Sequence, residues 1–195
     1  SFNQDISNWI TSRVEDMNTM FYDARLFNQD ISNWNTSNVI DMEGMFSKAI
    51  SFRNANQPLI TRGTAWDTSR VTNMSDMFCE ATVFNQDISN WDVSNVFRMT
   101  GMFDGARSFN QHNIGIWIIR DNCNIIDMFK NSGITSETFE GKVYGQKIAN
   151  YFDPPLPNPK TNEELRSYNP RRRIQDKSRL AIVGETLSED YITDK

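Results

Sequence analysis

Carboxylates recur at one position of this 195-residue sequence and are its best candidates for metal chemistry. Asp5, Asp30 and Asp87 each directly follow a Phe-Asn-Gln triplet. If the triplets belong to stacked repeats about 5 Å apart, oxygen ligands in such a row can hold Ca²⁺. The row is broken, however, because the third repeat is interrupted and His112 takes the acid's place in the last one. We therefore expect acids that cap turns, with calcium binding as the alternative.

The other reactive side chains do not form a catalytic set. The sequence has one His, no glycine-rich phosphate loop and two cysteines, Cys79 and Cys123, at unrelated positions. We therefore predict no enzyme activity and no cofactor. The cysteines lie about two repeats apart, roughly 10 Å, whereas a disulfide needs Cα atoms within about 7 Å. Free, partly buried thiols are expected.

Bulk properties narrow the range of partners. The net charge of −5 argues against nucleic acid as the main partner of the repeats. No apolar run approaches the length of a membrane-spanning helix, so membrane insertion is not expected.

A cluster of cations near the C-terminus is the candidate partner-binding site. It consists of Arg171, Arg172, Arg173, Lys177 and Arg179, followed by Leu180 and Ile182 in a short aliphatic run. The cations can contact phosphate, form salt bridges with an acidic protein or remain solvated, and we favour docking on a protein. The aliphatic run can add to a sheet edge by backbone pairing. Residues 160–195 are therefore predicted to be a docking tail that binds another protein chain through an acidic surface or a sheet edge.

An internal repeat positions the residues that precede this tail. Successive Phe residues at 2, 27, 52, 84 and 109 are 25, 25, 32 and 25 positions apart, and Trp recurs at 9, 34, 66, 91 and 117. The longer interval holds seven extra residues within 53–65. A period of this length is typical of coils that stack on one another. A Trp that recurs in every coil favours the core, and we expect Trp34 and Trp91 to be buried, with sugar-binding rings as the alternative.

Each coil is expected to contain a short strand and a short helix. Met17, Met20, Phe21 and Ala24 are spaced as one face of a helix, and the segment 30–34 favours a strand that pairs with its equivalent one coil along. The predicted fold is an α/β repeat solenoid, leucine-rich-repeat-like, with about five coils in residues 1–133. A C-terminal cap at 134–152 with a capping helix over 136–152, a Pro-rich linker at 153–159 and the extended tail follow.

The motif Phe-Asn-Gln-Asp-Ile-Ser-Asn-Trp-Asp-Val-Ser-Asn-Val, followed by Met and Met-Phe-x-x-Ala, resembles the 25-residue repeat of the BspA-like (DUF285) surface-protein family. That family is similar to leucine-rich repeats in which Phe, Trp and Met replace many leucines. The resemblance covers about residues 1–132 and departs most in the fifth copy, where Asn122 replaces Val.

The resemblance implies a non-catalytic protein-interaction scaffold of the surface or adhesion type. Such a protein is expected outside the cell or at its surface, where cell-surface macromolecules are further partners. Because the family also occurs in large DNA viruses, the alternative is a structural component of a virus particle or another large assembly. In that case the location is the virion, and the tail laces into neighbouring subunits.

The first coil begins at Phe2 with no polar element before it. Terminal repeats need a polar outer face to remain soluble. We therefore expect upstream residues or a stacked partner to cover this end.

Overall fold

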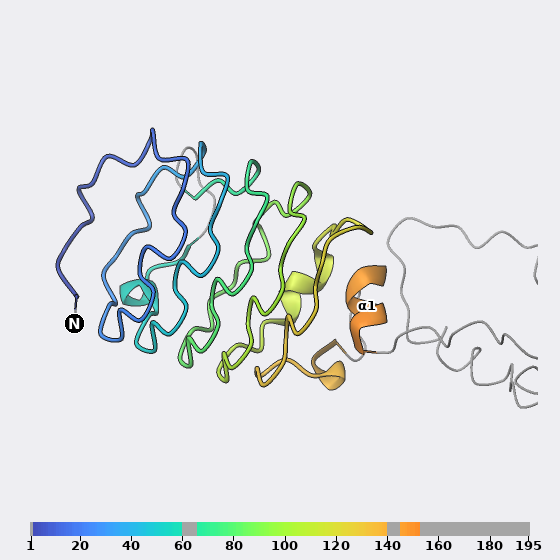
Figure 1. Cartoon of the computed structure of the whole chain (residues 1–195). Coiled ribbons are helices and arrows are strands. Elements are labelled where there is room, and N and C mark those ends of the chain that lie inside the picture. The colour runs from blue at the N-terminus through green and yellow to red at the C-terminus, as the bar shows by residue number, and fades with distance from the viewer. Residues whose placement is uncertain (1, 60–65, 140–144, 153–195) are drawn as a thin grey trace, which may run out of the picture.

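Five coils lie side by side in chain order in the computed structural model, which describes residues 2–59, 66–139 and 145–152. Coil 1 forms one end of the stack, and helix α1 (Gln146–Phe152) lies at the other (Figure 1). We number the coils 1 to 5 by their residues, which are 2–26, 27–51, 52–83, 84–108 and 109–133.

The expectation of an α/β solenoid with a strand and a helix in every coil is wrong. In the described residues no strand forms, and β structure is limited to isolated parallel bridges that link Asp16, Asp41, Asn73, Arg98 and Asn124 in this order. Helical structure in the same residues consists of α1 and three short 3₁₀ helices, η1 (Asn54–Asn56), η2 (His112–Ile116) and η3 (Ser136–Phe139).

The segment expected to be helical is a run of tight turns, which we call the turn run. It spans residues 17–24, 42–49, 74–81, 99–106 and 125–132 in coils 1 to 5. Every second N–H donates back three residues, as Met20 does to the Met17 carbonyl at 3.3 Å. In coils 1 to 4 the N–H groups between them donate sideways to the next coil, as Phe21 does to the Met45 carbonyl at 2.9 Å. In an α-helix the backbone N–H groups donate to carbonyls of the same helix, so the bonds from the turn run to the next coil exclude an α-helix here.

Backbone conformation explains why the helical spacing was misleading. Each turn run contains two residues with φ between +51° and +73°, in the columns 19, 44, 76, 101, 127 and 23, 48, 80, 105, 131. Gly, Asp and Asn account for seven of these ten positions, and they tolerate this left-handed region best. Consecutive turns with such residues bring Met17, Met20, Phe21 and Ala24 to one side, as a helix does, so the spacing could not separate the two.

The segment expected to be a strand forms turns, which an aspartate side chain and a local backbone bond stabilise. Asp30 Oδ1 accepts the N–H of Ser32 at 2.9 Å, and the Trp34 N–H donates to the Ile31 carbonyl at 3.1 Å. Local bonds of this kind compete with strand pairing. The Asp-Ile-Ser-Asn-Trp segment therefore turns rather than extends.

Stacked aromatic rings form the centre of the coils. Phe78 of coil 3 lies 3.9 Å from Phe84, the first residue of coil 4, measured between ring centroids. Its ring centroid lies 5.5 Å from that of Phe46 in coil 2 and 5.7 Å from that of Phe103 in coil 4. All four rings are fully buried. Each interface between coils is thus an aromatic contact as well as a hydrogen-bonded one.

The Trp column is part of this core, as predicted. Trp34, Trp66, Trp91 and Trp117 are buried. Each indole donates its N–H to a carbonyl of the preceding coil, as Trp91 Nε1 does to Leu59 at 2.8 Å. Trp9 in coil 1 differs, because 52% of it is exposed. Burial of the other four rings excludes sugar stacking on them.

A buried side-chain amide helps to hold the insertion in coil 3 in place. Asn54 is fully buried, and its Oδ1 accepts the N–H of Ile31 at 2.8 Å while its Nδ2 donates to the Gln57 carbonyl at 2.9 Å. Leu59 is buried and supplies the carbonyl that the Trp91 indole needs. Residues 60–65 lie outside the described part.

The region expected to be one capping helix contains two shorter pieces. η3 and α1 fall within 134–152, and residues 140–144 between them lie outside the described part. The predicted linker at 153–159 and tail at 160–195 also lie outside it.

Candidate interaction surface

The residues predicted to bind a partner are not among those that the structure describes. They are Arg171, Arg172, Arg173, Lys177, Arg179, Leu180 and Ile182. Docking through them stays a prediction, and the surface they would meet has to be sought on the coils.

The Asp column caps turns, as expected. Asp5, Asp30 and Asp87 each accept, through Oδ1, the N–H of the Ser two residues later at 2.9–3.0 Å. The bond from Ser7 lowers the pKa of Asp5. Within the described residues, no three His, Cys, Asp or Glu side chains gather closely enough to hold a metal ion.

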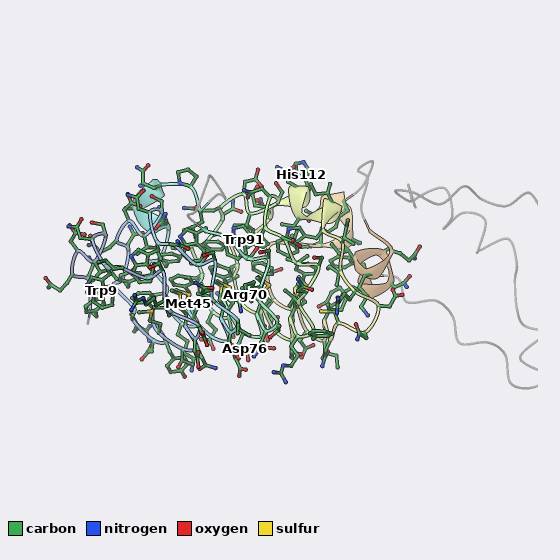
Figure 2. All side chains as sticks on the ribbon, turned by 90° about the horizontal axis from the view of Figure 1, so that it is seen from above. Trp9, Met45, Arg70, Asp76, Trp91 and His112 are labelled. Carbon is green, nitrogen blue, oxygen red and sulfur yellow. The ribbon has the colours of Figure 1, made fainter. Side chains whose placement is uncertain are left out.

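Acids gather instead on the outward side of the turn runs, on a surface that we call the acidic flank. It consists of Glu43, Asp76, Glu80, Asp104 and Asp127, which come from coils 2 to 5. The residues of this set are exposed or partly exposed. Figure 2 places Asp76 at one edge of the molecule and His112 at the opposite edge.

The charge of the flank is compensated only in part, because Lys48 interacts electrostatically with Glu80, and Lys130 with Asp104. Partial burial, with the charges of Glu43 and Asp104 next, raises the pKa of Asp76. The Asp76 carboxylate lies against Gly101 of the next coil, so it loses solvent on that side. Among the described residues the only flank acid in a salt bridge is Asp127, which pairs with Lys130 at 3.2 Å. The flank therefore attracts cations.

Sequence reasoning missed this surface because its five acids occupy four different columns, and only Asp76 and Asp127 share one. Glu43 follows Met42 directly, whereas Asp76 stands two residues after Met74 and Asp104 five residues after Met99. A reading based on recurring columns separates these residues. Only the turn run, which directs several of its columns outward, brings them to one side.

A cleft lies beside the insertion of coil 3. A cleft of about 550 Å³ is lined by Arg53, Asn56, Pro58, Val83, Asn85, Gln86, Asp87 and Ser108. The Gln86 amide is occupied by the insertion, since Oε1 accepts the Leu59 N–H and Nε2 donates to the carbonyls of Arg53 and Gln57. The insertion thus supplies Arg53, Asn56 and Pro58 to the wall of the cleft, and the Gln86 amide is not free to bind a ligand.

Both cysteines are free thiols, as predicted. Burial, with the charges of Asp76, Asp104 and Glu80 next, raises the pKa of Cys79 to about 11. Burial also raises the pKa of Cys123 to about 11. Because the thiolate is the reactive form, neither cysteine is an activated nucleophile.

No helix in the described part of the chain is long and apolar enough to cross a membrane.

A family model described as "Mycoplasma protein of unknown function, DUF285" matches residues 1–62 and, a second time, residues 54–151. Neither a curated protein nor a solved structure matches the chain. Since the two family matches together cover most of the sequence, the chain belongs to the DUF285 family.

Proposed function

We propose that this chain is a non-catalytic protein-interaction scaffold of the surface or adhesion type, and that its acidic flank binds basic segments of other protein chains. Membership of DUF285 is compatible with this role. The observation that carries the proposal is the excess of acids on the flank, in which Asp76, Glu80 and Asp104 form no salt bridge with a described residue, although Lys48 and Lys130 lie nearby.

The coils supply the scaffold, and the outward side chains supply the contact. Backbone bonds of 2.7–3.0 Å from the turn runs of coils 1 to 4 join each coil to the next. These bonds need no outward side chain, so the flank can differ from coil to coil without loss of the stack. Like charges held close together repel one another, and a cationic partner relieves that repulsion.

The tail of a neighbouring copy supplies suitable cations. Arg171, Arg172 and Arg173 lie close to Lys177 and Arg179 in sequence, and the docking prediction for the tail calls for an acidic surface. We propose that these cations bind the acidic flank of the neighbouring copy, with Leu180 and Ile182 adding apolar contact at the edge of the flank. We also propose that the protein is located outside the cell or at its surface, as the family resemblance implies.

A labelled peptide of residues 168–182 tests the proposal by fluorescence anisotropy against the full chain. We expect binding at low salt that weakens as salt is raised. The triple variant Asp76→Asn, Glu80→Gln and Asp104→Asn should raise Kd by about tenfold, since each exposed charge pair contributes about 0.3–1 kcal/mol.

The matched control changes three acids away from the flank. Asp5→Asn, Asp67→Asn and Asp92→Asn remove the same net charge. Asn at 67 and 92 should keep the turn caps because Asn35 caps the equivalent turn in coil 2, and Asn at 5 retains an Oδ1 acceptor for the Ser7 N–H. This control should leave Kd unchanged. An equal loss of affinity in both variants would show that net charge, and not the flank, binds the peptide.

A further inference from the structure

Backbone hydrogen bonds accompany the parallel bridges from coil to coil in a fixed pattern. The carbonyl before each bridge residue accepts an N–H of the next coil, as that of Phe97 does from Asn124 at 2.9 Å. The N–H after each bridge residue donates to the next coil, as that of Met99 does to the Asn124 carbonyl at 2.8 Å. Two residues further along, the Gly101 N–H donates to the Ile126 carbonyl at 2.9 Å. Each of coils 1 to 4 therefore offers its successor one acceptor and two donors in this region.

The same three groups of coil 5 are open. The Cys123 carbonyl accepts no hydrogen bond from a described residue, and the N–H groups of Ile125 and Asp127 donate to none. The chain does not end at this point, since η3 and α1 follow coil 5 in the described residues. The pattern that joins the coils thus stops inside the chain, at an edge that can pair with one more extended segment.

Helix α1 covers the groups on either side of this edge and leaves a gap between them. The Tyr151 hydroxyl accepts the Phe129 N–H at 3.1 Å, and the Lys147 ammonium donates to the Asp121 carbonyl. Figure 1 shows the helix beside the last coil. A cleft of about 350 Å³ is lined by residues 123–126 of coil 5 and by Lys147, Asn150 and Tyr151 of the helix. A segment can therefore reach the three open groups while α1 stays in place.

The tail contains a sequence that matches part of a coil. Asp176-Lys-Ser-Arg-Leu-Ala-Ile-Val183 matches Asp67-Thr-Ser-Arg-Val-Thr-Asn-Met74, the arm of coil 3 that leads into its turn run. The two share Asp, Ser and Arg, and both have apolar residues at the fifth and eighth positions. In coils 2 to 4 those two positions are a buried Val and a buried Met, on either side of the bridge residue. Residues 176–183 lie outside the described part, so the match is one of sequence.

We propose that residues 180–184 of a neighbouring copy pair with the open edge of coil 5 in this cleft. The sequence match sets the register, with Ile182 in the place of a bridge residue. The Ala181 N–H then donates to the Cys123 carbonyl, and the Ile182 carbonyl accepts the Ile125 N–H. Two residues on, the Gly184 carbonyl accepts the Asp127 N–H. Leu180 and Val183 take the positions that are buried in the coils, and backbone pairing supplies the rest of the contact.

The choice of a neighbouring copy rests on the proposed function, in which the same tail binds the acidic flank of that copy. Asp127 belongs to the flank and also supplies one of the three open groups. A tail that lies on the flank therefore reaches the edge of coil 5 at this residue. The peptide of residues 168–182 lacks Val183 and Gly184, so its anisotropy tests the flank without the complete joint. A failure of the flank is thus distinguishable from a failure of the joint.

Amide exchange of the full chain, followed by NMR at two widely separated chain concentrations, tests the proposal. The N–H groups of Ile125 and Asp127 should exchange about fivefold more slowly at the higher concentration, since they exchange only after the tail is released. Leu180→Asp combined with Val183→Asp should abolish this difference, because the joint would bury two charges. The N–H groups of Met99 and Gly101 donate between coils 4 and 5 and serve as references, whose exchange should not change.

The matched control places the same two charges elsewhere in the segment. Ala181→Asp combined with Ile182→Asp should keep the slow exchange, because the equivalent residues of coil 4, Phe97 and Arg98, are exposed although coil 5 follows them. Both double variants lie outside the coils and leave the coil residues unchanged.

Three results would overturn the proposal. Equal exchange at both concentrations in the wild type and in the Leu180→Asp and Val183→Asp variant would show that no tail docks at this edge. Slow exchange that does not depend on concentration and is lost in that variant would show that the chain's own tail fills the cleft. Loss of the slow exchange in the control as well would show that charge, and not the apolar pattern of the segment, governs the contact.

Discussion

Replacing Trp91 by Ala should destabilise the stack far more than the same change at Trp9, although both residues occupy one column. Trp91 is 3% exposed and donates to the Leu59 carbonyl at 2.8 Å, whereas Trp9 is 52% exposed and its indole has no described acceptor. A fully buried Trp covers about 200 Å² at about 25 cal/mol per Å², or about 5 kcal/mol at most.

The expected loss is about 3–5 kcal/mol of unfolding free energy for Trp91→Ala and about 2 kcal/mol for Trp9→Ala. Trp91→Phe keeps a ring in the stack and removes the donor, which should cost about 1–2 kcal/mol. Urea unfolding followed by circular dichroism measures all three. Equal losses at Trp91 and Trp9 would show that burial in this column does not stabilise the coils, and the reasoning would fail.

Three further changes test other parts of the fold. Gly101→Ala should lower the free energy of unfolding in urea by about 1–2 kcal/mol, because φ at this position is +59° and the added Cβ meets the Asp76 carboxylate. Adding Asp76→Gly should recover only the part of this loss that is due to the steric clash. Asn54→Ala should cost about 1–3 kcal/mol by leaving the Ile31 N–H without its acceptor, whereas a loss below 0.5 kcal/mol, about that of a surface substitution, would contradict this role. Cys79, whose pKa burial raises from 9.0 to about 11, should react with iodoacetamide at pH 8 about a hundredfold more slowly than in the unfolded chain. Its contribution to stability should be present below pH 9 and be lost as pH rises to about 11, a loss that should be missing in Cys79→Ala.

The positions of the coils and their buried residues could be predicted because apolar side chains recur at fixed spacing. The burial of Trp34 and Trp91 could be predicted without knowledge of the backbone, since a large ring that recurs in every coil has its lowest free energy in the core. The conformation between those residues could not be predicted in the same way. Met17, Met20, Phe21 and Ala24 satisfy the spacing of a helix face and that of a turn run equally well.

One signal in the sequence distinguishes the turn run from a helix. Gly44 and Gly101 share a column with Asp76 and Asp127, and residues of these types together mark a left-handed backbone position. The acidic flank was harder to find, because its members combine only after the backbone directs different columns to one side. The cations at 171–179 were visible in sequence, and their role as a binding site stays a prediction.

The alternating use of N–H groups in the turn run restricts where the chain can change its length. From Trp to the Met of the turn run, or to Ile125 in coil 5, is eight positions. From there to the Ala, or to Ser132 in coil 5, is seven. The seven extra residues of coil 3 and the one extra residue of coil 5 both lie between Phe and Trp. A single residue inserted into the turn run would exchange the sideways and local donors, as a register slip does in a sheet. New loops, tags or epitopes can therefore be inserted between Phe and Trp, whereas an insertion of one residue between Met and Ala should uncouple neighbouring coils.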